Sequence, residues 1–106
     1  MDSNAEEQAV ILTFISDRED LSDDEVGRIS TLEDLLYSKA LEFGEYDGNE
    51  IGGGRYTLYF YSPNAEGLAR ALMDVLAEQQ LPTRAEITTR YGPPGSRQTI
   101  IEVGSK

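Results

Sequence analysis

The segment from residue 45 to residue 50 holds the densest group of side chains that could do chemistry. It reads Glu45-Tyr46-Asp47-Gly48-Asn49-Glu50. Oxygen ligands of this kind suit Ca²⁺ or Mg²⁺, but the spacing is not that of an EF-hand. In a strand, Glu45, Asp47 and Asn49 would share one face. Tyr46 and Glu50 would share the other, which divides the ligands. We therefore expect a charged edge strand with no metal and no cofactor, and keep a cation at 45–50 as the alternative.

Three glycines, at positions 52 to 54, follow this segment and precede Arg55. They lack the spacing, the lysine and the following helix of a phosphate-binding loop. Their backbone amides, with Arg55 adjacent, could still hold an anion. A small-molecule site beside this turn would use Asp47, Asn49, Glu50 and Arg55 as its binding residues.

Tyrosines and arginines form a second candidate surface. Residues 55–61 alternate as a strand, so Tyr59 and Tyr61 share the face opposite its more apolar side chains. Arg84 and Arg90 share one face of a later strand. If helices cover the other side of the sheet, these four side chains form a mixed surface typical of protein binding. The alternatives are tyrosines packed in a dimer or under loops, and arginines paired with Glu86 and Glu102 of the last two strands.

Composition excludes several classes of function. The 106 residues include 20 acidic and 9 basic side chains, no His, no Cys and no Trp, and the net charge is −11. Imidazole bases, thiolate nucleophiles and Cys or His metal sites are therefore absent. The charge repels nucleic acids and anionic membranes and favours a basic protein partner. We expect a protein that is not an enzyme.

The elements that position these residues follow from periodicity. We expect strands at 9–15, 45–51, 55–61, 84–91 and 98–103, with helices at about 22–41 and from 63 to about 80. The first and third strands are the most apolar and should be central, and the second should be an edge. This order predicts an α+β fold, a ferredoxin-like βαββαβ two-layer sandwich with an additional C-terminal strand. Its helices would lie on one face of an antiparallel sheet.

Three local features stay open or depend on single residues. The segment at about 22–41 is either one helix or two short ones broken near Gly27 to Ser30, with one capping box at Ser22 and Glu25 and a second at Ser30 and Glu33. The turn before residue 55 is either Asp47-Gly48 or the glycine triplet. We favour the triplet, with Gly48 at a bulge. Ser62 before Pro63 is the predicted start of the second helix.

The domain organisation is simple. Residues 1–8 are expected to be a disordered tail, and residues 9–104 a single domain. The acidic first residues do not resemble a signal peptide, so we expect a cytoplasmic location. The leading functional hypothesis is an acidic adaptor, inhibitor or immunity-type domain that binds a protein through the open sheet face, with a basic protein as one specific form of the partner. The alternative is a small-molecule-binding regulatory module, expected to be a homodimer.

Overall fold

The computed structural model describes residues 8–103, which form seven elements of regular structure. In chain order they are β1 (Ala9–Ile15), α2 (Asp23–Ala40), β2 (Glu45–Gly52), β3 (Arg55–Tyr61), α3 (Ala65–Ala77), β4 (Arg84–Arg90) and β5 (Gln98–Val103). The strands form one open sheet in the order β2-β3-β1-β4-β5, and every pair of neighbours is antiparallel. The chain is therefore a small α+β domain, as predicted.

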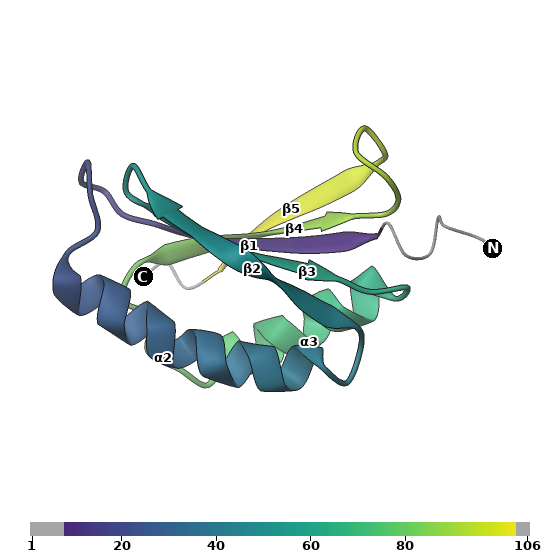
Figure 1. Cartoon of the computed structure of the whole chain (residues 1–106), viewed down its shortest axis with the longest axis horizontal. Coiled ribbons are helices and arrows are strands. Elements are labelled where there is room, and N and C mark those ends of the chain that lie inside the picture. Colours follow the sequence, from purple (N-terminus) through teal and green to yellow (C-terminus); the bar gives the residue numbers. More distant parts are fainter. Residues whose placement is uncertain (1–7, 104–106) are drawn as a thin grey trace.

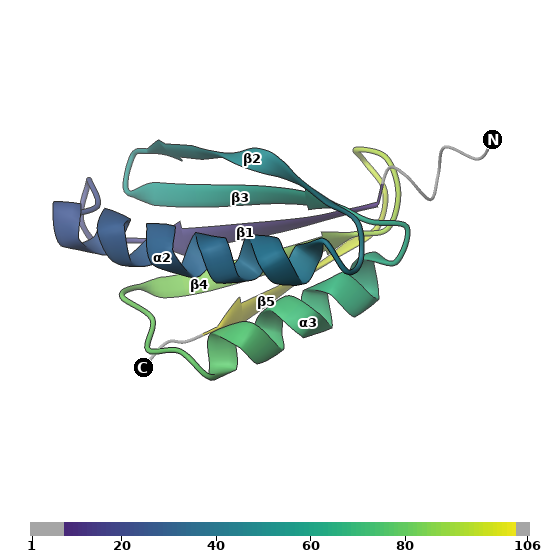
Figure 2. The ribbon, with the colours of Figure 1, turned by 60° about the horizontal axis from the view of Figure 1, so that its bottom comes forward.

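Both helices lie on one face of the sheet, and the opposite face has no helix over it (Figures 1 and 2). The core fills the space between the helices and the sheet. Its largest fully buried apolar side chains are Phe14, Phe60, Leu12, Ile29, Leu36, Leu58, Leu68, Leu72, Leu76, Ile87 and Val10. Within residues 8–103, neither helix is long and apolar enough to cross a membrane.

β1 is the middle strand because it is apolar at both parities. Val10, Leu12 and Phe14 are fully buried beneath the helices, while Ala9 and Ile15 are buried on the opposite face. β3 and β4 pair with β1 on its two sides. The predicted central places of β1 and β3 and the edge place of β2 are confirmed, and β5 forms the other edge.

α2 is one continuous helix, so the alternative of two short helices is wrong. Its start is a capping box. The Ser22 hydroxyl oxygen accepts a hydrogen bond from the Glu25 backbone N–H at 3.1 Å, and the Glu25 carboxylate accepts one from the Ser22 N–H at 2.8 Å. Gly27 costs a helix about 1 kcal/mol relative to Ala, which burial of side chains such as Ile29 and Leu36 offsets.

The turn between β2 and β3 uses the glycine triplet. Gly53 and Gly54 have φ values of +61° and +78°, a region that L side chains avoid. The competing turn at Asp47-Gly48 is therefore wrong. The pairing register shifts between Tyr46 and Gly48, so the predicted bulge is confirmed.

The start of α3 differs from its prediction. Asn64, not Ser62, is the N-cap, and its side-chain oxygen accepts a backbone N–H of the first turn at 3.0 Å. Ser62 is 2% exposed and donates its hydroxyl to the Phe43 carbonyl at 2.8 Å. It therefore secures the connection before β2. The helix ends at Ala77, three residues earlier than predicted.

The predicted boundaries of the domain are partly outside the described residues. Residues 1–7 of the predicted tail lie outside them, as does residue 104. Gln8, also assigned to that tail, belongs to the fold. Its backbone carbonyl accepts from the Ser62 N–H at 3.2 Å, and its side-chain oxygen accepts from the Ala65 N–H at 3.1 Å.

Two glycines offer a matched test of this packing. A Cβ at Gly44 would lie 2.1 Å from the Tyr61 carbonyl oxygen, whereas a Cβ at Gly27 meets nothing within 4 Å. We expect Gly44→Ala to lower the free energy of unfolding by about 1–3 kcal/mol. Gly27→Ala should raise it by about 0.5–1 kcal/mol. Urea unfolding followed by circular dichroism measures both. A Gly44→Ala protein as stable as the wild type would contradict the described contact between this loop and the end of β3.

Candidate functional site

The uncovered side of the sheet, called the open face below, is determined by strand register. Directly paired residues of antiparallel strands point to the same face, so Tyr59, Ile11 and Thr88 form one row across β3, β1 and β4. By the same pairing, the members of the open face are Glu45, Gly48, Glu50 and Gly52 of β2, Arg55, Thr57, Tyr59 and Tyr61 of β3, Ala9, Ile11, Thr13 and Ile15 of β1, Arg84, Glu86, Thr88 and Arg90 of β4, and Gln98, Ile100 and Glu102 of β5.

Tyr59, Tyr61 and Ile11 form the centre of one half of this face, and are called the aromatic patch. Both tyrosines lie on the open face, and all three side chains are half-buried. The Tyr59 hydroxyl donates to Glu50 Oε1 at 2.8 Å. This hydrogen bond, with slight burial, raises the pKa of Tyr59. The phenol therefore stays neutral near pH 7, and the patch presents two rings with polar tips.

Arg84 and Arg90 also lie on the open face, across the sheet from the tyrosines. Arg84 Nη1 is 3.3 Å from the carboxylate of Glu102 on β5, which confirms the predicted cross-strand pair for Arg84, and 3.9 Å from that of Glu86 on its own strand. Arg90 Nε donates to a backbone carbonyl two residues later at 2.8 Å. Both guanidinium groups are thus held against the sheet as a polar margin to the apolar centre.

The predicted grouping of the β2 side chains is wrong. Asn49 lies on the helix side together with Tyr46, whereas Glu50 lies on the open face. The bulge at Asp47 inserts one extra residue and reverses the alternation beyond it. The structure therefore separates Asn49 from Glu50 and Arg55, and leaves Asp47 exposed at the bulge.

On the helix side, Glu33 of α2 accepts three hydrogen bonds from β2 and β3, an arrangement called the Glu33 cluster. Asn49 Nδ2 donates at 2.8 Å, the Tyr56 hydroxyl donates at 2.6 Å, and the Tyr46 hydroxyl also donates. The Tyr46 ring packs on Phe60 with a centroid separation of 5.1 Å. Within residues 8–103 no cation pairs with Glu33. Three neutral donors therefore satisfy the carboxylate and tie α2 to the edge strand.

The protonation states of this cluster follow from its contacts. Partial burial acts to raise the pKa of Glu33, but the three donated hydrogen bonds outweigh it and lower this pKa below its usual range. Burial, together with the hydrogen bond to Glu33, raises the pKa of Tyr56 to about 12 and also raises the pKa of Tyr46. At neutral pH the cluster therefore consists of one charged carboxylate and two neutral phenols. Its role is to stabilise the packing of α2 on the sheet.

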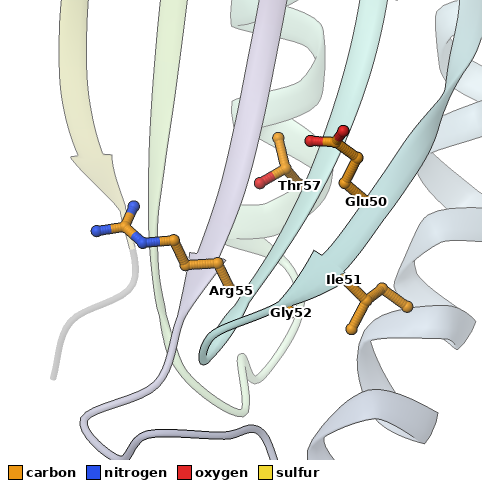
Figure 3. Close-up of a pocket in the computed structure, with 5 residues that line it drawn as sticks. All are labelled: Glu50, Ile51, Gly52, Arg55 and Thr57. Carbon is orange, nitrogen blue, oxygen red and sulfur yellow. The ribbon is translucent and has the colours of Figure 1, made fainter.

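A shallow concavity lies beside the β2–β3 turn. It is lined by Glu50, Ile51, Gly52, Arg55 and Thr57. In Figure 3 the Arg55 side chain extends away from Glu50, and Ile51 points toward the helix side. In the described part of the chain, Arg55 is the one cationic side chain without an ion pair, hydrogen bond or ring contact. Glu50 and Arg55 thus both line the concavity without contacting each other, while Asp47 and Asn49 are not among its lining residues.

Charge is distributed unevenly over the molecule. The open face carries three arginines and four glutamates, a balance of −1, whereas residues 8–103 as a whole carry eight basic and seventeen acidic side chains, a balance of −9. In residues 8–103 no group of three or more acidic side chains is arranged to hold a metal ion. Most of the negative charge therefore lies away from the open face.

Sequence reasoning missed Glu33, Ile11 and Ile100. An acid within a predicted helix indicates a solvated side chain, and nothing in the sequence pairs Glu33 with tyrosines more than ten residues away. Ile11 and Ile100 could have been found. Once the strand pairing is known, alternation assigns both side chains to the face that carries the tyrosines and arginines.

Glu33→Gln tests the Glu33 cluster. Since hydrogen bonds to a charged acceptor are stronger than neutral ones, we expect a loss of about 1–2 kcal/mol of unfolding free energy at pH 7. Asp34→Asn, on the exposed position next to it, is the matched control and should change stability by less than about 0.5 kcal/mol. Equal effects of the two substitutions would refute the cluster's role.

The same cluster predicts a dependence of stability on pH. A carboxyl whose pKa is lowered in the fold stabilises it above the unfolded value of 4.5, and this contribution disappears as pH falls through the folded pKa. A phenol whose pKa is raised stabilises the fold below the unfolded value of 10.0, and this contribution disappears as pH rises toward 12. The denaturant midpoint, measured from pH 3 to pH 12, should fall at both the acidic and the alkaline end of this range. In Glu33→Gln both decreases should be smaller. If both decreases in the midpoint are unchanged in Glu33→Gln, other ionisable groups cause them and the prediction is wrong.

Comparison of the chain with protein-family models, with curated proteins and with solved structures found no match. The function of this domain is therefore inferred from its own surfaces.

Proposed function

We propose that this chain is a non-catalytic binding domain that contacts another protein through the open face. The observation that carries this proposal is the aromatic patch on a sheet face that no helix covers. Tyr59 and Tyr61 each offer a large apolar ring and a hydroxyl group, and Ile11 extends the apolar area between strands. Aromatic side chains that remain partly accessible on a surface are enriched at protein interfaces.

The surroundings of the patch support the same proposal. Arg84 and Arg90 on one side and Glu45 and Glu50 on the other give a polar margin around an apolar centre. This pattern matches the core and rim of protein interfaces. The near-neutral charge of the open face further implies that binding there depends on burial more than on long-range attraction, so salt should weaken it only slightly.

A basic partner is the second form of this proposal, and it would use a different surface. The loop before α2 and its first turn carry six acidic side chains, namely Asp17, Glu19, Asp20, Asp23, Asp24 and Glu25. An inhibitor or immunity-type protein that masks a cationic target would bind there, and its binding would be strongly salt-sensitive. Salt sensitivity therefore separates the two forms.

Absence of catalysis is also a proposal. Glu33 accepts three side-chain hydrogen bonds, and its pKa is lowered. A carboxylate that acts as a general base near neutral pH needs a raised pKa instead. The lowered pKa of Glu33 therefore argues against a role for this residue as a general base.

For the fold, we infer a ferredoxin-like arrangement extended by β5. What supports it is that β1-α2-β2 and β3-α3-β4 are two similar units, with both helices on one side of the sheet. The fold carries no functional assignment, because ferredoxin-like domains serve many functions.

Small-molecule binding at the turn is a separate candidate function. Arg55 and Glu50 beside the concavity favour it, because Arg55 forms no ion pair, side-chain hydrogen bond or ring contact within residues 8–103. A ligand held there would be an anion or a zwitterion. Arg55→Ala should abolish its binding, and Tyr61→Ala should leave that binding unchanged.

The proposal is tested by affinity capture from the native lysate with salt washes. The bait proteins are the wild type, Tyr59→Ala, Tyr61→Ala and Tyr37→Ala. Tyr37 is the matched control, because it is 45% exposed on α2, away from the open face. We expect the Tyr59 and Tyr61 variants to retain at least about tenfold less of a stoichiometric partner, and Tyr37→Ala to retain it fully.

Each bait must first show the wild-type unfolding midpoint. A partner that resists high salt and requires Tyr59 and Tyr61 supports the open face. A partner released by salt and retained by all three variants contradicts it and points to the acidic loop before α2.

A further inference from the structure

The two edges of the sheet differ in how they are protected against pairing. β2 carries a bulge at Asp47, a glycine within the strand and the carboxylates of Glu45 and Glu50. These features block the addition of another strand. β5 has no bulge and no glycine, and its one carboxylate, Glu102, is paired with Arg84 of β4. It spans Gln98–Val103 without glycine, proline or lysine, and pairs with β4 in one unbroken register.

β5 also exposes apolar side chains on both faces. Ile100, on the open face, is 58% exposed, and Ile101, on the helix side, is 44% exposed. No other strand combines two adjacent isoleucines with this exposure within residues 8–103. A regular, apolar edge strand is a template for pairing with another strand.

The charge of the molecule selects what can approach this edge. Residues 84–103 contain three arginines and two glutamates, a balance of +1. Residues 8–83 contain five cationic and fifteen acidic side chains, a balance of −10. The two strands at this edge therefore carry little of the negative charge of the chain, so two copies can approach along β5 with little repulsion between these strands.

We propose that β5 pairs antiparallel with β5 of a second copy, about a two-fold axis at Ile100, to give a continuous ten-stranded sheet. Isologous pairing requires a self-complementary strand. In this register Ile100 lies opposite the partner's Ile100, Thr99 opposite the partner's Ile101, and Gln98 opposite the partner's Glu102. The Gln98 amide can donate to that carboxylate, and no like charges meet.

Neighbouring registers are less favourable. A shift by one residue on one strand would pair side chains of opposite faces and is excluded by alternation. An axis at Ile101 would place Ile100 opposite the partner's Glu102, and an axis at Thr99 would place Ile100 opposite the partner's Gln98, so each sets an apolar side chain against a polar one. The register centred on Ile100 is therefore the one that the side chains of β5 support.

This dimer goes beyond the proposed function and leaves the aromatic patch free. The two-fold axis is perpendicular to the sheet, so both open faces lie side by side on one surface, and both helical layers lie on the other. A partner of the open face would then meet two copies of Tyr59 and Tyr61 on a single platform.

The test is the mass of the full chain in solution, measured by light scattering and by sedimentation over a range of concentrations. We expect the wild type to reach twice the chain mass. Ile100→Lys should raise the dimer dissociation constant at least about a hundredfold, because two ammonium groups would face one another across the axis. Ile51→Lys is the matched control, since Ile51 is 52% exposed on the opposite edge, and it should remain dimeric. Unfolding midpoints check that both variants fold.

A wild type that stays monomeric at every concentration overturns the proposal. So does a dimer that survives Ile100→Lys, or one that is lost equally in Ile51→Lys. These outcomes would not decide the proposed binding of a partner to the open face. That proposal is tested separately, with the Tyr59 and Tyr61 variants.

Cross-linking provides a second, independent readout. The chain contains no cysteine, so Ile100→Cys introduces a unique thiol. Directly opposite residues of an antiparallel pair have Cα atoms about 4.5–5.5 Å apart, within the range that a disulfide bridges. Mild oxidation should therefore link Ile100→Cys rapidly into a covalent dimer and Ile51→Cys slowly. Equal rates for the two variants would contradict the proposed axis.

Discussion

The pairing of β1 with β3 on one side and β4 on the other is the constraint on which the rest of this structure depends. Because each strand alternates, a single register assigns every side chain of the sheet either to the helices or to the open face. Val10, Leu12 and Phe14 form the floor of the core, and the residues between them reach the opposite surface. The aromatic patch is a direct consequence, since Ile11 lies beside Tyr59 only in this register.

The Glu33 cluster provides the complementary constraint at the β2 edge. β2 is an exposed strand with a bulge, and apolar burial alone holds it weakly. Glu33 connects α2 to Tyr46, Asn49 and Tyr56, and so fixes the edge strand against the helix layer. The acidic segment that looked most suited to chemistry is therefore divided between a structural cluster on one face and the Glu50–Tyr59 hydrogen bond on the other.

Much of the fold could be predicted because its elements have strong local signals. The alternation of residues 55–61, the capping box at Ser22 and the glycine triplet each specify local structure with few competing solutions. The side-chain grouping in β2 could not be predicted, because the effect of a bulge on alternation depends on which residue stays unpaired. Glu33 and Gln8 escaped prediction for a related reason. Their roles depend on partners distant in the sequence, and a polar residue in a helix or near a chain end ordinarily indicates solvent exposure.

The central claim is that the open face meets another protein, and site-specific photo-crosslinking tests it most directly. Replacing Tyr61 by the photoreactive residue p-benzoylphenylalanine keeps an aromatic ring in the patch, and the same replacement at Tyr37 samples the helical layer. Irradiation in the native cell should yield one discrete adduct of higher mass from position 61 and none from position 37. An adduct from position 37 alone, or none from position 61 while the partner still co-purifies, would contradict the account.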